Sequence, residues 1–479
     1  MKIIWMTLLS TLLLTASGHQ ENGTKEAIVK IYTTSKLPNY QEPWNSSMRS
    51  STGSGAIIEG GYILTNAHVV ANRAFIEVQR YGQRKRYIAK VYAVSHQSDL
   101  ALLKVEEKAF FHGVKPLTFG SLPKVEQKIV VYGYPMGGST LSATIGVVSR
   151  VEHHVYAHSG ESFLAVQVDA AVNPGNSGGP ALSDGKIVGV VMQSITKSQN
   201  IGYLVPVNMV QHFIDDMKDG KYNGFADLGL GTKKLENPAI RRYYGIDENV
   251  SGKLIVKVVH NSSLSGILQE GDILTAVDGH NVENDGTVEF RKNEYTHYQH
   301  FVDAYQMGES VRLDIIRDKV KMQVEAPLKH VADDMYLVKT TRYDTMPSYF
   351  VYGGYVFSPL TRNLIVSTKL NRLKLSYLAS KWQEDDKSEV VVLLKVLASD
   401  MSRGDNDFAM WPIDKINGQP FKNFKEFYEK MQGETSEYIV LEDNDGVKVI
   451  IDREEAQTKQ SAILRKYNIE FDRSVDLRE

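Results

Sequence analysis

The stretch Ala171-Val172-Asn173-Pro174-Gly175-Asn176-Ser177-Gly178-Gly179-Pro180 places one serine among three glycines and between two prolines. Proline fixes φ and glycine reaches backbone angles that other residues avoid, so the stretch predicts a tightly shaped turn. A serine in such a turn can present its hydroxyl while neighbouring N–H groups point into one small space, which is the arrangement that acyl transfer needs. The alternative is a surface turn in which the serine only caps or is solvated.

Two sequence motifs upstream of this turn contain candidate catalytic partners for Ser177. His68 directly follows a predicted strand, within TNAHVV (65–70), and Asp99 precedes the predicted strand 100–105. An imidazole can take the serine proton near neutral pH, and a carboxylate behind it holds the tautomer and stabilises the imidazolium. Each residue alone could be an ordinary turn residue. Together, at three strand ends, they predict a Ser-His-Asp triad.

The serine turn also satisfies G-x-S-x-G, the nucleophile elbow of α/β-hydrolases. That fold needs a helix after the serine and the chain order serine, acid, histidine. Here a predicted strand at 186–192 follows the serine, and the order is histidine, aspartate, serine. Both features favour a chymotrypsin-type double β-barrel over an esterase of the hydrolase fold.

The rest of the chain is predicted to be mainly β, with short strands separated by turn signals. Segment 33–52 contains Pro38, Pro43 and several serines, and we expect a long surface loop there. A helix-spaced apolar pattern that ends at Gly220 predicts the close of the first domain near residue 222. Two later α+β segments share an order of strand, turn, helix and strand, which indicates a diverged tandem repeat.

Length, charge and composition exclude several other classes of function. The chain of 479 residues is long enough for about three domains. Its net charge of −2 and the lack of a long Lys/Arg run argue against a nucleic-acid partner. With no cysteine, there is no thiol nucleophile and no disulfide framework. Neither a phosphate loop nor a complete metal-ligand set occurs in the sequence, so we expect no cofactor and no metal.

The first 18 residues have the features of a secretory signal peptide. Lys2 precedes an apolar run at 3–14, and small residues follow it. The run is short for a membrane span, so we expect no stable span after cleavage, with an uncleaved anchor as the alternative. The expected location is outside the cytoplasm, in a bacterial periplasm or cell envelope.

Three phrases resemble the catalytic motifs of the Deg/HtrA serine proteases: TNAHVV (65–70), SDLALLKV (98–105) and VNPGNSGGPAL (172–182). GSGAII (53–58) and NIGYLVPVNMV (200–210) match that family as well. The long loop before the first motif, the divergent second repeat and the end of the chain are most similar to the plant-type Deg subgroup.

The resemblance implies a domain order. A trypsin-like protease domain is expected at 25–222, a PDZ domain at 224–328, a PDZ-like domain at 335–455 and a C-terminal tail at 456–479. It also implies an ATP-independent serine endopeptidase that degrades unfolded or damaged proteins and assembles into homo-oligomers built from trimers. A chaperone or scaffold with latent proteolysis is the alternative function.

Site residues carried over from the family follow the same motifs. The resemblance implies Ser177 as the nucleophile, His68 as the base and then the acid, and Asp99 as the group that orients His68. The backbone N–H groups of Gly175 and Ser177 would form the oxyanion hole. Ala171 would form the floor of the P1 pocket, and because it carries no charge we expect cleavage after small or medium aliphatic residues. The expected pocket walls are Gly189, Gln193, Ile201 and Gly202.

In the first PDZ domain, the carboxylate-binding loop is expected at Asp227-Leu228-Gly229-Leu230. The family has an aromatic residue before the Leu-Gly pair, whereas this chain has an aspartate. A carboxylate at this position repels a peptide C-terminus unless it points away. We therefore expect this domain to bind internal segments or to serve a structural role.

Overall fold

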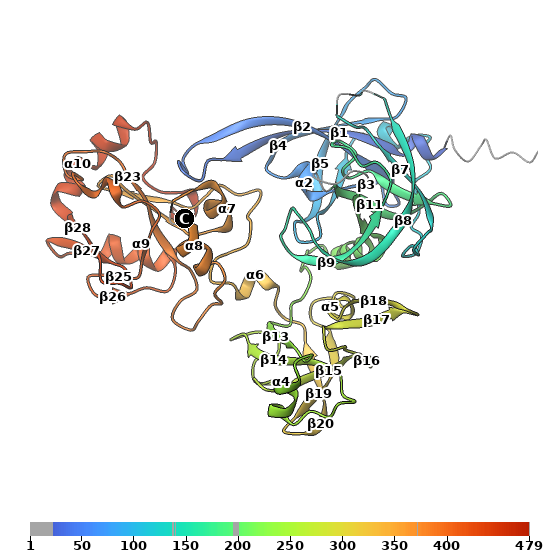
Figure 1. The fold of residues 1–479 in the computed structure, drawn as a ribbon. Coiled ribbons are helices and arrows are strands. Elements are labelled where there is room, and N and C mark those ends of the chain that lie inside the picture. The colour runs from blue at the N-terminus through green and yellow to red at the C-terminus, as the bar shows by residue number, and fades with distance from the viewer. Residues whose placement is uncertain (1–22, 137, 139, 195–200, 371, 479) are drawn as a thin grey trace, which may run out of the picture.

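The computed structural model describes residues 23–136, 138, 140–194, 201–370 and 372–478. The expected signal peptide, residues 1–18, lies outside this part of the chain. Two closed barrels of six strands each form the N-terminal half, with strand orders β1-β2-β3-β6-β5-β4 and β10-β11-β12-β9-β8-β7. The prediction of a mainly β, double-barrel fold is therefore confirmed (Figure 1).

The first barrel consists of β1 (Ile28–Pro38), β2 (Ser46–Ile58), β3 (Tyr62–Thr65), β4 (Arg73–Arg80), β5 (Tyr87–Ser95) and β6 (Leu100–Val105). The second consists of β7 (Lys128–Gly133), β8 (Ser142–Val155), β9 (Ser162–Val168), β10 (Pro180–Ser183), β11 (Lys186–Ser194) and β12 (Gly202–Pro206). The short helix α2 (Ala67–Val70) follows β3, and α3 (Val207–Asp216) follows β12. The helix predicted before Gly220 is thus present.

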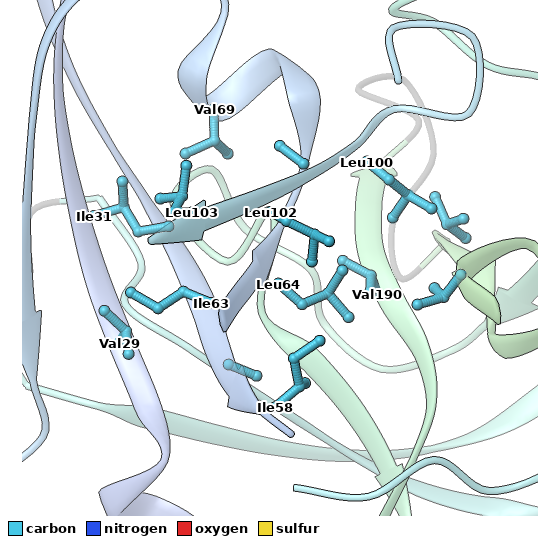
Figure 2. Packing of buried hydrophobic residues seen from close by; sticks show 14 of the residues in the cluster. Val29, Ile31, Ile58, Ile63, Leu64, Val69, Leu100, Leu102, Leu103 and Val190 are labelled. Atoms are coloured by element: carbon cyan, nitrogen blue, oxygen red, sulfur yellow. The ribbon is translucent and has the colours of Figure 1, made fainter. Parts of the chain in front are cut away.

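One apolar cluster joins the two barrels. Inward-pointing residues of β1, β3 and β6 meet in it, and Val190 of β11 lies beside them (Figure 2). Residues 100–103 are all buried, because both faces of β6 are covered. A strand this well packed holds the residue before it, Asp99, in a fixed place.

The prediction of a long surface loop at 33–52 is wrong. β1 and β2 continue through most of it as a hairpin, with Thr33 opposite Ser51 and Pro38 opposite Ser46. The hairpin extends beyond the barrel toward the C-terminal domain (Figure 1). This stretch is rich in serine and threonine, and two of these residues, Thr33 and Ser35, are buried at positions where apolar residues would mark a strand. Tyr40 and Trp44 at the tip pack against the C-terminal domain's core.

The middle domain is built on an antiparallel sheet of order β13-β14-β15-β19-β20, with β16 paired to β15 and a separate hairpin of β17 and β18. Its elements are β13 (Leu230–Lys234), α4 (Pro238–Tyr244), β14 (Lys253–Val258), β15 (Ile273–Val277), β16 (His280–Asn281), β17 (Thr287–Arg291), β18 (Glu294–His297), α5 (Gln299–Val302), β19 (Ser310–Arg317) and β20 (Val320–Pro327).

The C-terminal domain contains two four-stranded sheets, β21-β22-β23-β24 and β26-β25-β27-β28. Its elements are α6 (Ala332–Met335), β21 (Phe350–Tyr352), β22 (Tyr355–Pro359), α7 (Arg362–Ser367), α8 (Arg372–Leu378), β23 (Val391–Val396), β24 (Trp411–Ile413), β25 (Lys415–Ile416), β26 (Gln419–Pro420), α9 (Phe424–Gly433), β27 (Tyr438–Glu442), β28 (Lys448–Asp452) and α10 (Arg453–Lys466).

Residues 456–479 were expected as a separate tail, but their described part belongs to this C-terminal domain. Ile463 of α10 and Ile469 are buried in its core, and Phe350 forms a β-bridge with Arg473. Few apolar residues mark this segment, so its sequence alone did not indicate packing. Across the described residues, no helix combines the length and apolar character that crossing a membrane requires.

Candidate active site

His68 and Asp99 are brought together at strand ends of the first barrel, where β3 and β6 are paired. His68 lies in α2, directly after β3, and Asp99 lies between β5 and β6. His68 Nδ1 is 2.7 Å from Asp99 Oδ2, and the His68 backbone N–H donates to Asp99 Oδ1 at 2.9 Å. Two contacts to one carboxylate fix both the position and the rotation of the imidazole. The other ring nitrogen, Nε2, is left to face a reacting group.

The backbone around Asp99 is held in an uncommon conformation. Its φ is 55°, in the left-handed region that few residues other than glycine adopt. The Asn66 side-chain amide donates to the Asp99 carbonyl oxygen at 2.8 Å. Such conformations persist where surrounding contacts enforce them, and they occur often at functional sites. Here the contact aims the carboxylate at His68.

Electrostatics at this pair favour a charged carboxylate and a basic imidazole. Burial by itself lowers the pKa of His68, but the charge and hydrogen bond of Asp99 outweigh it, so the net pKa is raised. Burial raises the pKa of Asp99, and the opposing effects of His68 and His158 together are larger, so the net pKa is lowered. Asp99 is only 1% exposed, whereas the His68 side chain is 33% exposed. The base is therefore accessible and its partner is not.

Ser177 lies in the turn between β9 and β10. Its Oγ donates to the Met192 carbonyl oxygen at 3.3 Å. Ser177 and His68, both of which the structure describes, are not hydrogen-bonded to each other. Hydrogen bonds between catalytic groups are often formed only when substrate binds. Attack would require the hydroxyl to leave Met192 and donate to His68 Nε2.

The glycines of the serine turn allow close contact between backbones. Gly175 has a φ of 99°, and a Cβ there would lie 2.4 Å from the Tyr134 carbonyl oxygen. A Cβ on Gly178 would lie 2.1 Å from Thr65 Oγ1. Both distances are too short for a side chain, so the turn needs glycine at both positions.

Ser54 of β2 is a site residue that the sequence interpretation missed. Its Oγ donates to the Gly175 carbonyl oxygen at 2.7 Å and accepts from the Tyr134 N–H at 2.8 Å. Its own N–H donates to the Ser177 carbonyl oxygen at 2.9 Å. The residue is fully buried. It therefore ties the serine turn of the second barrel to the first barrel. The signal was present in GSGAII (53–58), where this serine stands between two glycines.

The peptide unit between Pro174 and Gly175 has a defined direction. The Pro174 carbonyl oxygen accepts a hydrogen bond from Met136 N–H at 2.7 Å. Because the two polar groups of a trans peptide point in opposite directions, the Gly175 N–H is directed away from Met136. Within the described residues, neither this N–H nor that of Ser177 donates to another protein group. Both amides are available to a substrate oxygen.

Four of the expected P1-pocket residues, Ala171, Gln193, Ile201 and Gly202, occupy neighbouring positions on the second barrel, whereas Gly189 lies four residues before Gln193 along β11 and apart from them. Ala171 follows β9 and is half-buried. Gly202 begins β12, and a Cβ there would lie 2.5 Å from Val172, the neighbour of Ala171. Ile201 packs against the barrel core. In β11, Gln193 is paired with Tyr203 and Gly189 with Pro206.

The expected PDZ loop is closed by its own aspartate. Asp227 Oδ1 accepts the Gly229 N–H at 2.7 Å, so this carboxylate occupies a loop amide instead of pointing outward. Leu228 is buried and Leu230 begins the edge strand β13. Elsewhere in the described ranges, no group of three or more His, Cys, Asp or Glu side chains is arranged to hold a metal.

Comparisons with known proteins agree with this architecture. A model of the trypsin-like peptidase domain matches residues 53–190, and a model of the PDZ domain matches residues 338–476. Protease Do-like 4, mitochondrial, from Arabidopsis thaliana is 35% identical, covering 92% of this chain and 84% of that protein. Protease Do-like 2, chloroplastic, from the same plant is 36% identical, covering 95% and 75% respectively.

Relatives extend beyond plants. A serine protease DegP homolog from Plasmodium falciparum is 31% identical, covering 88% of this chain and 60% of that protein. Among solved structures, the HtrA-type protease AlgW with decapeptide matches with a TM-score of 0.50 and 22% identity, covering 66% of this chain and 98% of that chain. At this identity the structural match supports the fold.

Proposed function

This chain belongs to the Deg/HtrA family of serine endopeptidases and is similar to its plant-type members, and we propose that it degrades unfolded or damaged proteins without ATP. The proposed catalytic groups are Ser177, His68 and Asp99. The observation that carries the proposal is the double contact of His68 with buried Asp99, beside a serine turn whose Gly175 and Ser177 amides donate to no group in the described part of the chain.

The proposed reaction proceeds through an acyl-enzyme. Ser177 Oγ attacks the scissile carbonyl carbon while His68 Nε2 takes its proton, and Asp99 stabilises the imidazolium that forms. The carbonyl oxygen becomes an oxyanion and accepts hydrogen bonds from the N–H groups of Gly175 and Ser177. His68 then gives its proton to the departing amine. Water, activated by the same base, hydrolyses the ester. Each step uses only water and the protein's own groups, so none requires a nucleotide.

We propose that the P1 pocket selects small or medium aliphatic side chains. Ala171 presents a methyl group where a carboxylate would be needed to pair a lysine or arginine, and burying an unpaired cation is costly. In a peptide library, cleavage after Val, Ala or Ile is expected to exceed cleavage after Lys or Arg by at least about tenfold. A profile dominated by Lys or Arg would contradict this assignment.

The domain boundaries of the proposal are 25–222 for the protease, 224–328 for the first PDZ domain and a C-terminal PDZ-like domain that begins near 335. The first PDZ domain is proposed not to capture free peptide C-termini, because the Asp227 carboxylate already occupies the Gly229 amide.

Family membership supports a homo-oligomer built from trimers. The plant relatives are named as mitochondrial or chloroplastic and give no support to a bacterial periplasm, so we propose an organelle.

A chaperone or scaffold with latent proteolysis is the second candidate. The two are separated by incubating the full chain with an unfolded casein-like protein and with a fluorophosphonate probe. The protease is expected to digest the substrate, and mass spectrometry is expected to locate the probe on Ser177. An enzyme that suppresses aggregation over a range of temperatures, cleaves nothing and leaves Ser177 unlabelled would favour the chaperone.

A further inference from the structure

Four side chains form a wall next to the general base: His96, His158, Tyr343 and Asp344. His158 comes from the connection between β8 and β9, and its ring centroid lies 6.1 Å from that of His68. His158 Nε2 lies 2.9 Å from His96 Nδ1. We call this group the His158 wall. Tyr343 and Asp344 belong to the segment of the C-terminal domain between α6 and β21, so the wall joins parts of the chain far apart in sequence.

Tyr343 holds His158 by its ring and by its backbone. The two rings are stacked, with centroids 4.0 Å apart and an interplanar angle of 23°. The Tyr343 hydroxyl donates to the His158 carbonyl oxygen at 2.7 Å. The same tyrosine ring also stacks on His96 at 4.6 Å. His158 is therefore braced from the side by a residue outside both barrels.

Asp344 anchors this segment to the first barrel. Its Oδ2 lies 3.0 Å from His96 Nε2 and also contacts the Arg73 guanidinium. Its Oδ1 accepts the Asn72 N–H at 2.6 Å, and its own N–H donates to Asn72 Oδ1 at 2.7 Å. A charged group with this many partners specifies one docked position, because each hydrogen bond restricts the geometry further.

The His158 ring acts through its shape, because it is uncharged at neutral pH. Burial lowers the pKa of His158 to about 4, despite the nearby Asp99 carboxylate. The other titratable groups that act on it are His96, His68 and Asp344. A neutral ring adds no charge beside His68 when the latter becomes an imidazolium.

When a substrate runs along the exposed side of the His68 ring to present its carbonyl to Ser177, the P2 side chain, which belongs to the residue before P1, would lie next to the His158 ring, whose centroid is 6.1 Å from that of His68. We propose that His158 is a specificity-determining residue that restricts P2 to small side chains, with Tyr343 and Asp344 as its positioning residues. This inference rests on the proposed function of His68 and Ser177.

The test uses the full chain and peptides that differ only at P2, with Ala, Val or Phe. The quantity compared is the ratio of kcat/KM for Ala to that for Phe within each variant. Wild type is expected to favour Ala by at least about tenfold, since poor fit in a pocket costs one to two orders of magnitude. His158→Ala is expected to abolish most of this preference, and Tyr343→Ala to reduce it severalfold.

Two variants serve as controls. Tyr343→Phe keeps the stacked ring and is expected to retain the preference, and so is Thr345→Ala, at an exposed neighbouring position. Because each ratio is measured within one protein sample, a lower folded fraction cancels. The inference is overturned if an active His158→Ala enzyme has the same Ala-to-Phe ratio as wild type, or if Tyr343→Ala does. Either result leaves the proposed function intact. If wild type cleaves none of the peptides, or Ser177→Ala cleaves them equally, the proposed function fails and the inference fails with it.

Discussion

Replacing Ser177 with alanine is expected to lower kcat for a cleaved peptide by roughly 10⁶-fold, with little change in KM. The hydroxyl is the atom that bonds to the substrate carbon, and neither His68 nor Asp99 can replace it in that step. Substrate binding uses other contacts, so KM is expected to stay near its wild-type value. Steady-state kinetics on one fluorogenic peptide measures both constants.

The same substitution leaves most of the site in place. Alanine keeps the N–H at position 177, and the lost hydroxyl has only a 3.3 Å hydrogen bond to the Met192 carbonyl oxygen. The melting temperature is therefore expected to change by no more than a few degrees, roughly the effect of 1 kcal/mol or less. Ser183→Ala, in the following strand β10, is the matched control and is expected to retain activity. Activity of the Ser177→Ala protein above about 1% of wild type would contradict a nucleophilic serine.

The double barrel and the proposed triad could be predicted because their signals are local. His68, Asp99 and Ser177 each stand at a strand end within a distinctive phrase, and their order in the chain excludes the hydrolase elbow. The structure adds how His68 and Asp99 meet, through the ring and the backbone at once. It also shows that Asp99 has a φ of 55°, which no sequence pattern reveals.

The hairpin of β1 and β2 could not be predicted, because the usual strand signal is absent there. Serine and threonine fill most of its positions, including the buried Thr33 and Ser35, so apolar and polar residues do not alternate there. The role of Ser54 could not be predicted for a different reason. A buried serine between two glycines acquires a role only when Gly175 and Tyr134 are brought to it by the fold.

The His158 wall shows the same limit more strongly. Tyr343 and His158 are separated by a whole domain, and neither belongs to a motif. The sequence alone therefore gives His158 no role. Its position beside His68 follows from domain docking, which periodicity and spacing do not describe.

Replacing Asp99 with asparagine is expected to lower kcat by about 10⁴-fold, because it imposes the wrong tautomer on His68. In the native protein, one carboxylate oxygen accepts the His68 backbone N–H and the other faces Nδ1. In the variant, the amide oxygen can keep the backbone contact, so the NH₂ group faces Nδ1 and donates to it. The proton of the imidazole is then held on Nε2, which cannot accept the proton of Ser177. A rate within tenfold of wild type would contradict the orienting role of Asp99.

The pH dependence of this variant gives a second, independent measurement. In wild type, Asp99 raises the pKa of His68 above its usual 6.5, although burial acts to lower it. A base works only when unprotonated, so kcat/KM is expected to fall as the pH drops through this raised pKa. Asparagine removes the charge and leaves the burial, so the pKa of His68 falls and the acid limb of the residual activity moves to lower pH. Profiles between about pH 5 and 9 would detect the shift, since it crosses the ordinary range of histidine. A limb that stays in place, or moves to higher pH, would mean that His68 is not the titrating base.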